Sequence, residues 1–389
     1  MSRWGRVTKT AGVVAGTAAA GFGAVMAAER FAARLRPEPD SEAAEPLGEL
    51  RGRELIVPSD DGMPLHVEIN GPDDAPITVI FSHGYALNQD SWHYQRRDLA
   101  ACARLVFWDQ RGHGRSGPLA GPPVSIDRTG ADLHAVIGAV TGTDRRVVLV
   151  GHSMGGMTIM ALAARYPELF GAKIVGLVLI GTAAGGLSSP DGLVPWMPSP
   201  LRIMLQRAVP TVLRTAARGR RAVLVEHGRK ASSEIEFLAT RFLAFGDPWM
   251  SVTVTDFLGQ IIRQAPVGVI AEFYSALLKH DAHDVPGVLS RVPVTVVVGD
   301  RDRLIPPQLG IDLAESIDGS RLVIVEGAGH AVILERPDVV NETISSMVAQ
   351  VQIRAQAPAP RPVSACGDAP RQDRVKSICP DLPGGPEAL

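Results

Sequence analysis

The residue whose surroundings point most directly to chemistry is Ser153. It lies in the pentapeptide Gly151-His152-Ser153-Met154-Gly155, between an aliphatic run that favours a strand and an Ala-rich run that favours a helix. A chain that turns so sharply leaves its central side chain strained and projecting. The flanking glycines let neighbouring backbone pass close by, and the N–H of Met154 at the helix start points to where an oxyanion would form. The pattern therefore predicts that Ser153 is a nucleophile. The alternative is a Gly-rich turn between a strand and a helix that contains a serine without a catalytic role.

Carboxylates and a histidine follow other aliphatic runs of the chain. Asp300 and Asp302 come directly after one run, and His330 follows the last. If these runs are parallel strands, their carboxyl ends share one edge of a sheet, which would bring the three side chains close to Ser153. A serine hydroxyl needs a base to take its proton, and a histidine base needs a carboxylate to hold its tautomer. The order Ser, Asp, His thus predicts nucleophilic catalysis.

Strands and helices must alternate to position these residues. The chain opens with a predicted hairpin of Glu54 to Pro58 and Leu65 to Ile69. The later predicted strands are short and aliphatic throughout, as is typical of strands covered on both faces: Ile77 to Phe81, Leu105 to Trp108, Val147 to Val150, Ile174 to Ile180, Val294 to Val298 and Leu322 to Val325. Helical patterns such as Asp132 to Val140 separate most of them. The sequence therefore predicts an α/β fold with a doubly wound, mostly parallel sheet.

A helical insertion is expected at residues 185–291, within a core formed by residues 54–184 and 292–352. Its predicted helices are Leu201 to Leu213, Ile235 to Phe245, Val252 to Ile262 and Val267 to Leu278. Such an insertion would form a lid over the rim of the sheet and line an apolar pocket, unless its large side chains only fill its own core. Those side chains are Trp196, Met197, Met204, Phe237, Phe242, Phe245, Trp249, Met250, Phe257 and Phe273.

Composition excludes several classes of protein. A net charge of -2 argues against a nucleic-acid partner, and 46% hydrophobic residues suffice for one large core. The three cysteines (Cys102, Cys366 and Cys379) rule out a disulfide scaffold and lack the spacing of a zinc site. Residues 280–284 contain two His and two Asp, but no further ligand set accompanies them, so we expect no metal and no other cofactor.

The two ends of the chain are not predicted to belong to the core. Residues 1–36 contain an uncharged run, Ala11 to Ala28, rich in Ala and Gly. This composition fits a membrane anchor, a cleaved signal peptide or a cytosolic Ala-rich helix. The expected location is accordingly membrane-associated or exported, with the cytoplasm as the alternative. Residues 37–53 resemble a linker, residues 353–389 resemble a disordered tail, and no oligomeric state is indicated.

From about Glu54 to Gln352, apart from the insertion, the chain resembles α/β-hydrolase-fold serine hydrolases. Five motifs carry the resemblance: Gly151 to Gly155, His83-Gly84-Tyr85, Asp109 to Ser116, Gly299 to Asp302 and Gly327 to His330. The resemblance implies that Ser153 is the nucleophile, His330 the base and Asp302 the orienting acid. It also implies that the backbone N–H groups of Tyr85 and Met154 form the oxyanion hole.

Two further carboxylates compete for the acid role. Asp300 falls at the strand end, where its side chain is expected to cap the turn, so the loop position favours Asp302. Asp109 follows a different strand, and we expect it to form a structural ion pair with Arg111 or Arg115.

Two further histidines are expected to have structural roles. His152 adjoins the nucleophile, but a neighbour in a sharp turn points away from the serine and is expected to pack. His83 is expected to brace the oxyanion segment.

The expected reaction is attack of Ser153 on an ester-like carbonyl, followed by hydrolysis of the acyl-enzyme. The substrate is expected to be a small hydrophobic ester, and the motifs look most similar to the esterase and cofactor-free haloperoxidase (perhydrolase) group. Thioesterase, C–C bond hydrolase and aminopeptidase activities use the same triad and remain alternatives, as does a non-catalytic ligand-binding protein.

Overall fold

The computed structural model describes residues 40–101, 103–119, 124–142, 145–189, 192–194, 196–197 and 233–356. Contacts group Met1–Ala355 into one unit and Gln356–Leu389 into a second. The segment at residues 1–36, predicted to be an anchor or signal, lies outside the described residues, as does most of the predicted tail at 353–389. Within the described ranges, no helix combines the length and the apolar character needed to cross a lipid bilayer.

The centre of the molecule is an eight-stranded sheet in the order β1-β2-β4-β3-β5-β6-β7-β8. β1 and β2 form the predicted hairpin, β2 pairs antiparallel with β4, and the remaining neighbours are parallel. The strands are β1 (Arg53–Pro58), β2 (Pro64–Asn70), β3 (Ile77–Ser82), β4 (Arg104–Trp108), β5 (Arg146–His152), β6 (Ile174–Ile180), β7 (Val294–Gly299) and β8 (Arg321–Val325). The predicted α/β architecture with a mostly parallel sheet is thus confirmed.

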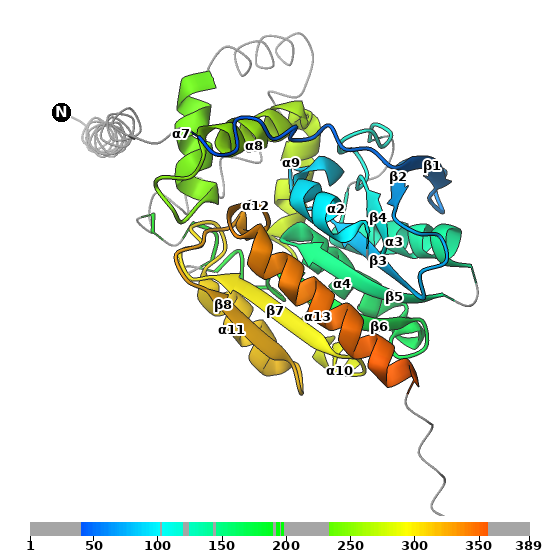
Figure 1. The fold of residues 1–389 in the computed structure, drawn as a ribbon. Coiled ribbons are helices and arrows are strands. Elements are labelled where there is room, and N and C mark those ends of the chain that lie inside the picture. The colour runs from blue at the N-terminus through cyan, green and yellow to red at the C-terminus, as the bar shows by residue number, and fades with distance from the viewer. Residues whose placement is uncertain are drawn as a thin grey trace, which may run out of the picture. The chain divides into compact units, whose positions relative to one another are not determined.

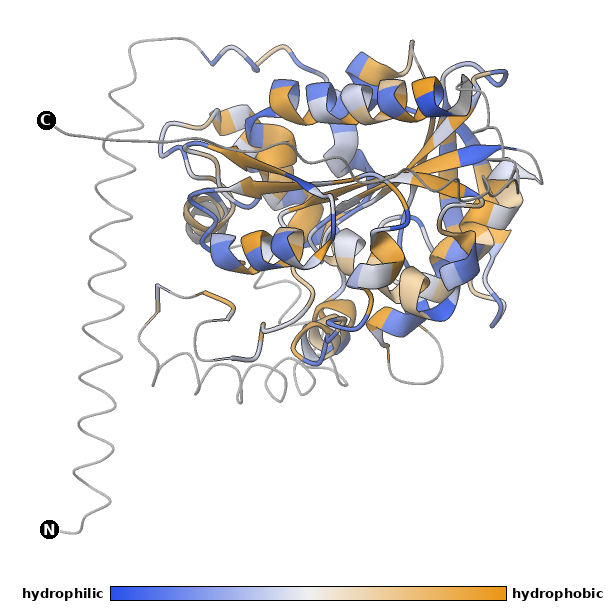
Figure 2. Cartoon of the chain, turned by 90° about the horizontal axis from the view of Figure 1, so that it is seen from below, coloured by the Kyte–Doolittle hydropathy of each residue, from blue (hydrophilic) through white to orange (hydrophobic). Residues whose placement is uncertain are grey.

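Helices cover both faces of this sheet (Figure 1). Outside the insertion they are η1 (Gln89–Trp92), α2 (His93–Leu99), α3 (Ile126–Thr141), α4 (Met154–Arg165), η2 (Pro167–Leu169), α11 (Pro307–Ser316), α12 (Val332–Glu335) and α13 (Pro337–Gln356). Apolar residues dominate the strands, whereas the helices carry mixed polar and apolar residues (Figure 2).

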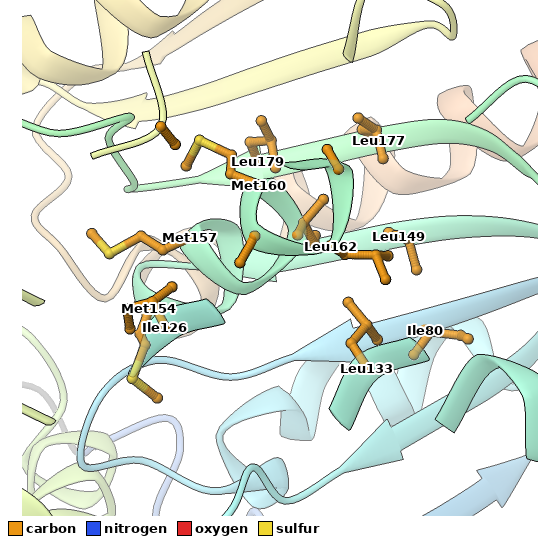
Figure 3. Packing of buried hydrophobic residues seen from close by; sticks show 14 of the residues in the cluster. Ile80, Ile126, Leu133, Leu149, Met154, Met157, Met160, Leu162, Leu177 and Leu179 are labelled. Carbon is orange, nitrogen blue, oxygen red and sulfur yellow. The ribbon is translucent and has the colours of Figure 1, made fainter. Parts of the chain in front are cut away.

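Two buried apolar clusters lie on opposite faces of the sheet. In β3, Ile80 belongs to the cluster that includes α3, α4 and α11, whereas Val79 and Phe81 belong to the cluster that includes α2 and α13. Leu149 of β5 packs near Leu133 of α3 in the first cluster (Figure 3). Because successive side chains of a strand point to opposite faces, coverage on both sides requires the uninterrupted aliphatic runs seen in the sequence.

The described part of the insertion contains the short helix α10 (Pro286–Leu289) near its end and three longer helices, α7 (Ser233–Ala244), α8 (Val252–Gln264) and α9 (Val267–Leu277), which lie together in Figure 1. The three longer helices match three of the predicted helices to within about two residues. The fourth, Leu201 to Leu213, lies outside the described residues.

The segment predicted as a linker, residues 37–53, is held against the domain from residue 40 onward. The Asp40 carboxylate accepts hydrogen bonds from the N–H and the hydroxyl of Thr253 at the start of α8, both at 2.9 Å. Tyr94 of α2 donates to Glu42 at 2.8 Å. The segment therefore connects the insertion to a core helix.

Candidate active site

Ser153 occupies a strained turn between β5 and α4. Its backbone has φ 53° and ψ -118°, a conformation that costs about 1 to 3 kcal/mol for a residue other than glycine. A Cβ on Gly155 would lie 1.9 Å from the carbonyl oxygen of Ser82, and one on Gly151 would lie 2.6 Å from the backbone of Gly155. The glycines on both sides of the serine are thus required by close backbone approach, as the sequence predicts.

His330 and Asp302 meet at the carboxyl ends of β8 and β7. His330 Nδ1 lies 2.7 Å from Asp302 Oδ2, and both side chains are buried. The other carboxylate oxygen accepts hydrogen bonds from the N–H groups of Leu304 and Ile305 at 2.8 and 2.9 Å. Because an ionised carboxylate can only accept, Nδ1 carries the proton in this contact, and Nε2 is the nitrogen that could act as a base.

Asp300 points elsewhere. Its Oδ1 accepts a hydrogen bond from the N–H of Gly327 at 2.7 Å, so it caps the turn after β8. Of the two carboxylates that the sequence leaves as candidates, Asp302 is therefore the one that contacts His330.

The segment predicted to form the oxyanion hole is pressed against the serine turn. A Cβ on Gly84 would lie 3.3 Å from Cβ of Ser153, so only glycine fits comfortably there. Gly84, Tyr85, Ser153 and His330 all line one cavity of about 330 Å³. The Tyr85 hydroxyl donates to the carbonyl of Ile270 in α9 at 2.6 Å, which links this segment to the insertion.

Buried neutral histidines support the same segment. His83 Nε2 accepts from the N–H of Gln110 at 2.9 Å while Nδ1 donates to the Gly84 carbonyl at 2.7 Å. His113 Nε2 lies 3.3 Å from the N–H of Ala86. Burial lowers the pKa of His83 to about 4 and that of His113 to about 3, so both remain neutral near pH 7. His83 braces this segment, as expected from the sequence.

The ion pair expected of Asp109 forms with Arg115, whose Nε lies 3.9 Å from Asp109 Oδ2, and not with Arg111. Asp109 accepts from the N–H groups of Gln89 and Arg115 at 2.8 and 2.9 Å. Arg111 points toward α3 instead and forms a bidentate ion pair with Asp132, in which both N···O distances are 2.6 Å. The buried Asp132 carboxylate lies outside the Asp109 to Ser116 motif and binds the guanidinium with two hydrogen bonds. The spacing of residues within the motif could not predict this partner.

The cavity is lined mainly by aliphatic side chains rather than by the aromatic residues that the sequence suggested. Of the ten large side chains expected there, Met197 lines the cavity among the described residues. Phe245 and Phe273 are buried in the apolar clusters, and Trp196 and Trp249 are exposed. The helices of the insertion contribute Ala244, Leu258, Ile262, Tyr274 and Leu277 instead. None of the described residues that line this cavity is an Asp, Glu, Lys or Arg.

Glu335 was not singled out from the sequence. Its buried carboxylate accepts hydrogen bonds from the N–H groups of Asp247 and Gly329 at 2.7 Å and of Gly246 at 3.1 Å. Because Gly329 immediately precedes His330, this carboxylate ties the loop of the histidine to the end of α7. The sequence offers only a weak signal, a lone acidic residue in an apolar stretch.

The potential metal ligands do not form a convincing cation site. In residues 280–284, Asp281 contacts His283 at 2.7 Å, and both side chains are exposed. Within the described ranges, the one group of three ligand atoms close enough to share an ion belongs to Glu54, His66 and Glu68. Glu68 already pairs with the guanidinium groups of Arg96 and Arg115, which would repel a cation.

Comparisons with known proteins agree with this geometry. A model of the alpha/beta hydrolase family matches residues 79–343. The chain is 26% identical to a bifunctional esterase/perhydrolase of Acinetobacter calcoaceticus, over 75% of this chain and 98% of that protein. It is 27% identical to a pimeloyl-[acyl-carrier protein] methyl ester esterase of Neisseria meningitidis, over 68% of this chain and 91% of the relative. A solved thermophilic esterase from Thermogutta terrifontis shares the fold, with a TM-score of 0.61, 22% identity and coverage of 77% of this chain and 99% of its own.

Proposed function

Because this chain belongs to the alpha/beta hydrolase family, we propose that it is a serine hydrolase that cleaves carboxylic esters of hydrophobic small molecules through an acyl-enzyme on Ser153. The observation that carries the proposal is the 2.7 Å contact between Asp302 and His330, beside the cavity that both His330 and Ser153 line. These three groups are the parts that acyl transfer by a serine requires.

Each group has one task in the proposed reaction. His330 Nε2 takes the hydroxyl proton as Ser153 attacks the carbonyl, and then gives that proton to the leaving alcohol. Asp302 holds the ring and stabilises the imidazolium. Water then attacks the acyl-enzyme by the same route. The N–H groups of Tyr85 and Met154 would donate to the oxyanion, a contribution worth about 3 kcal/mol for one donor in comparable sites.

The cavity supports an uncharged, apolar acyl or alcohol group. A volume of about 330 Å³ is at the lower end of the range for small-molecule pockets. A carboxylate or ammonium on the substrate would lose its hydration there, and no described lining residue is an Asp, Glu, Lys or Arg that could compensate. The insertion helices that line the cavity would act as its lid.

A chain-length series tests this function. Each buried methylene is worth about 0.8 kcal/mol, so p-nitrophenyl esters of C4 to C8 acids should exceed the acetate by roughly 10- to 100-fold in kcat/KM. Ser153→Ala should lower kcat on the same esters by about 10⁶-fold. A variant that kept a tenth of the wild-type rate would refute the nucleophile, and a profile that falls steadily from C2 would refute the acyl pocket.

Perhydrolysis is a second candidate, favoured by the relative that is both esterase and perhydrolase. The same acyl-enzyme would then react with hydrogen peroxide instead of water. Peracid formation from an acetate ester and peroxide, absent in Ser153→Ala, would support it.

A further inference from the structure

His152 is next to Ser153 along the chain and contacts His330 in the folded structure. It is the last residue of β5 and precedes Ser153 directly, and its side chain is buried. Its ring centroid is 5.0 Å from that of His330 and 6.3 Å from that of Trp92. A Cβ on Gly84 would come within 3.0 Å of its Nδ1. The ring is therefore enclosed on several sides.

One nitrogen of this ring holds the backbone of the base. His152 Nε2 lies 2.9 Å from the carbonyl oxygen of His330. A carbonyl only accepts, so Nε2 carries the proton and Nδ1 is left with a lone pair. Burial, with a smaller effect from the nearby His330, lowers the pKa of His152 to about 3, which keeps this neutral tautomer at neutral pH.

The other nitrogen has no hydrogen-bond partner among the described residues. A buried acceptor without a donor is costly, and most native structures avoid it. A purely space-filling role would be served by an apolar side chain without this cost. The bond made by Nε2 is the interaction that offsets it.

The loop of His330 is held at three consecutive residues. The N–H of Gly329 donates to Glu335, and the N–H of Ala331 donates to the carbonyl of Ala244 at 2.7 Å. These two contacts come from elements outside the serine turn. The bond from His152 to the His330 carbonyl comes from the turn itself, so it relates the position of the base directly to that of Ser153.

We propose that His152 is a positioning residue for catalysis: its Nε2–H, bonded to the His330 carbonyl, fixes the base relative to the Ser153 hydroxyl. This inference rests on the proposed serine hydrolase function. Because misplacement of a catalytic group lowers the rate of the chemical step, loss of the bond should act mainly on kcat and leave KM nearly unchanged.

A matched pair of variants isolates the hydrogen bond. In His152→Gln the side-chain amide nitrogen takes the place of Nε2 and keeps the donor, whereas His152→Met has similar length and no donor. We expect His152→Met to lower kcat by about 10- to 100-fold on a p-nitrophenyl ester. His152→Gln should recover most of that loss. The rate of labelling by a fluorophosphonate should follow the same order, and thermal unfolding of each variant measures folding.

Three results would overturn the proposal: equal losses in the Met and Gln variants, a wild-type kcat in the Met variant, or a change confined to KM. If His152→Met does not fold, His152→Asn replaces it, because its amide reaches only the position of Nδ1. Failure of this inference remains distinct from failure of the function. A wild-type protein that hydrolyses no ester would refute the function, whereas an active protein insensitive to the donor refutes only the role of His152.

Discussion

At the scale of single residues, Asp300 and Asp302 are only two positions apart, yet their side chains have different partners. Asp302 contacts His330, whereas the Asp300 side chain accepts a hydrogen bond from the N–H of Gly327. We expect Asp302→Asn to lower kcat by about 10⁴-fold, since the amide favours the wrong histidine tautomer. Asp300→Asn should cause only a small change. Steady-state kinetics of both variants on one ester checks this, and the reverse order of effects would make Asp300 the acid.

The edge of the sheet at which Ser153, Asp302 and His330 lie could be predicted because each of them follows an aliphatic strand within a few residues. Strand ends fix backbone positions, and the sheet brings these positions together. The direction of long side chains could not be predicted in the same way. Arg111 binds the buried carboxylate of Asp132 on α3, which lies outside its own motif in the sequence. Phe245 and Phe273 are buried in the apolar clusters and do not line the cavity.

At the scale of secondary-structure elements, Glu335 connects α7, α12 and the loop of His330. Glu335→Gln removes the charge that several backbone N–H groups share, and it leaves one of them facing an amide donor. We expect a loss of about 2 kcal/mol in the free energy of unfolding. The exposed Glu342 of the adjoining helix is a matched control, and Glu342→Gln should change stability by less than about 0.5 kcal/mol. Urea denaturation of both variants checks this, and equal stabilities would contradict it.

No periodic pattern in the sequence predicts the contacts of Glu335. The partners of Glu335 are backbone amides from two loops that meet only after folding. Helix and strand positions, by contrast, follow from local patterns. The predicted helices of the insertion that fall within the described ranges are therefore confirmed, although their pocket-lining side chains were assigned incorrectly.

At the scale of the whole molecule, the segment from Asp40 to Gly52 joins the insertion to the core. Glu45 contacts His93 and Arg97 of α2 at 2.7 and 2.8 Å, and Asp40 contacts α8. Deletion of residues 1–36 should therefore leave a folded, active domain, because the described strands and these contacts all lie beyond residue 36. Deletion of residues 1–49 should lower the melting temperature and the esterase rate. Equal behaviour of the two truncations would show that this segment does not support the insertion.

The central claim is that Ser153 is an activated nucleophile, and active-site labelling tests it most directly. Only a serine with an aligned base reacts rapidly with a fluorophosphonate. Treatment of the full-length protein followed by peptide mass spectrometry should find a single adduct, on Ser153. The adduct should be absent from Ser153→Ala and should form far more slowly in His330→Ala. A folded wild-type protein that carries no adduct, or carries it on another residue, would contradict the account.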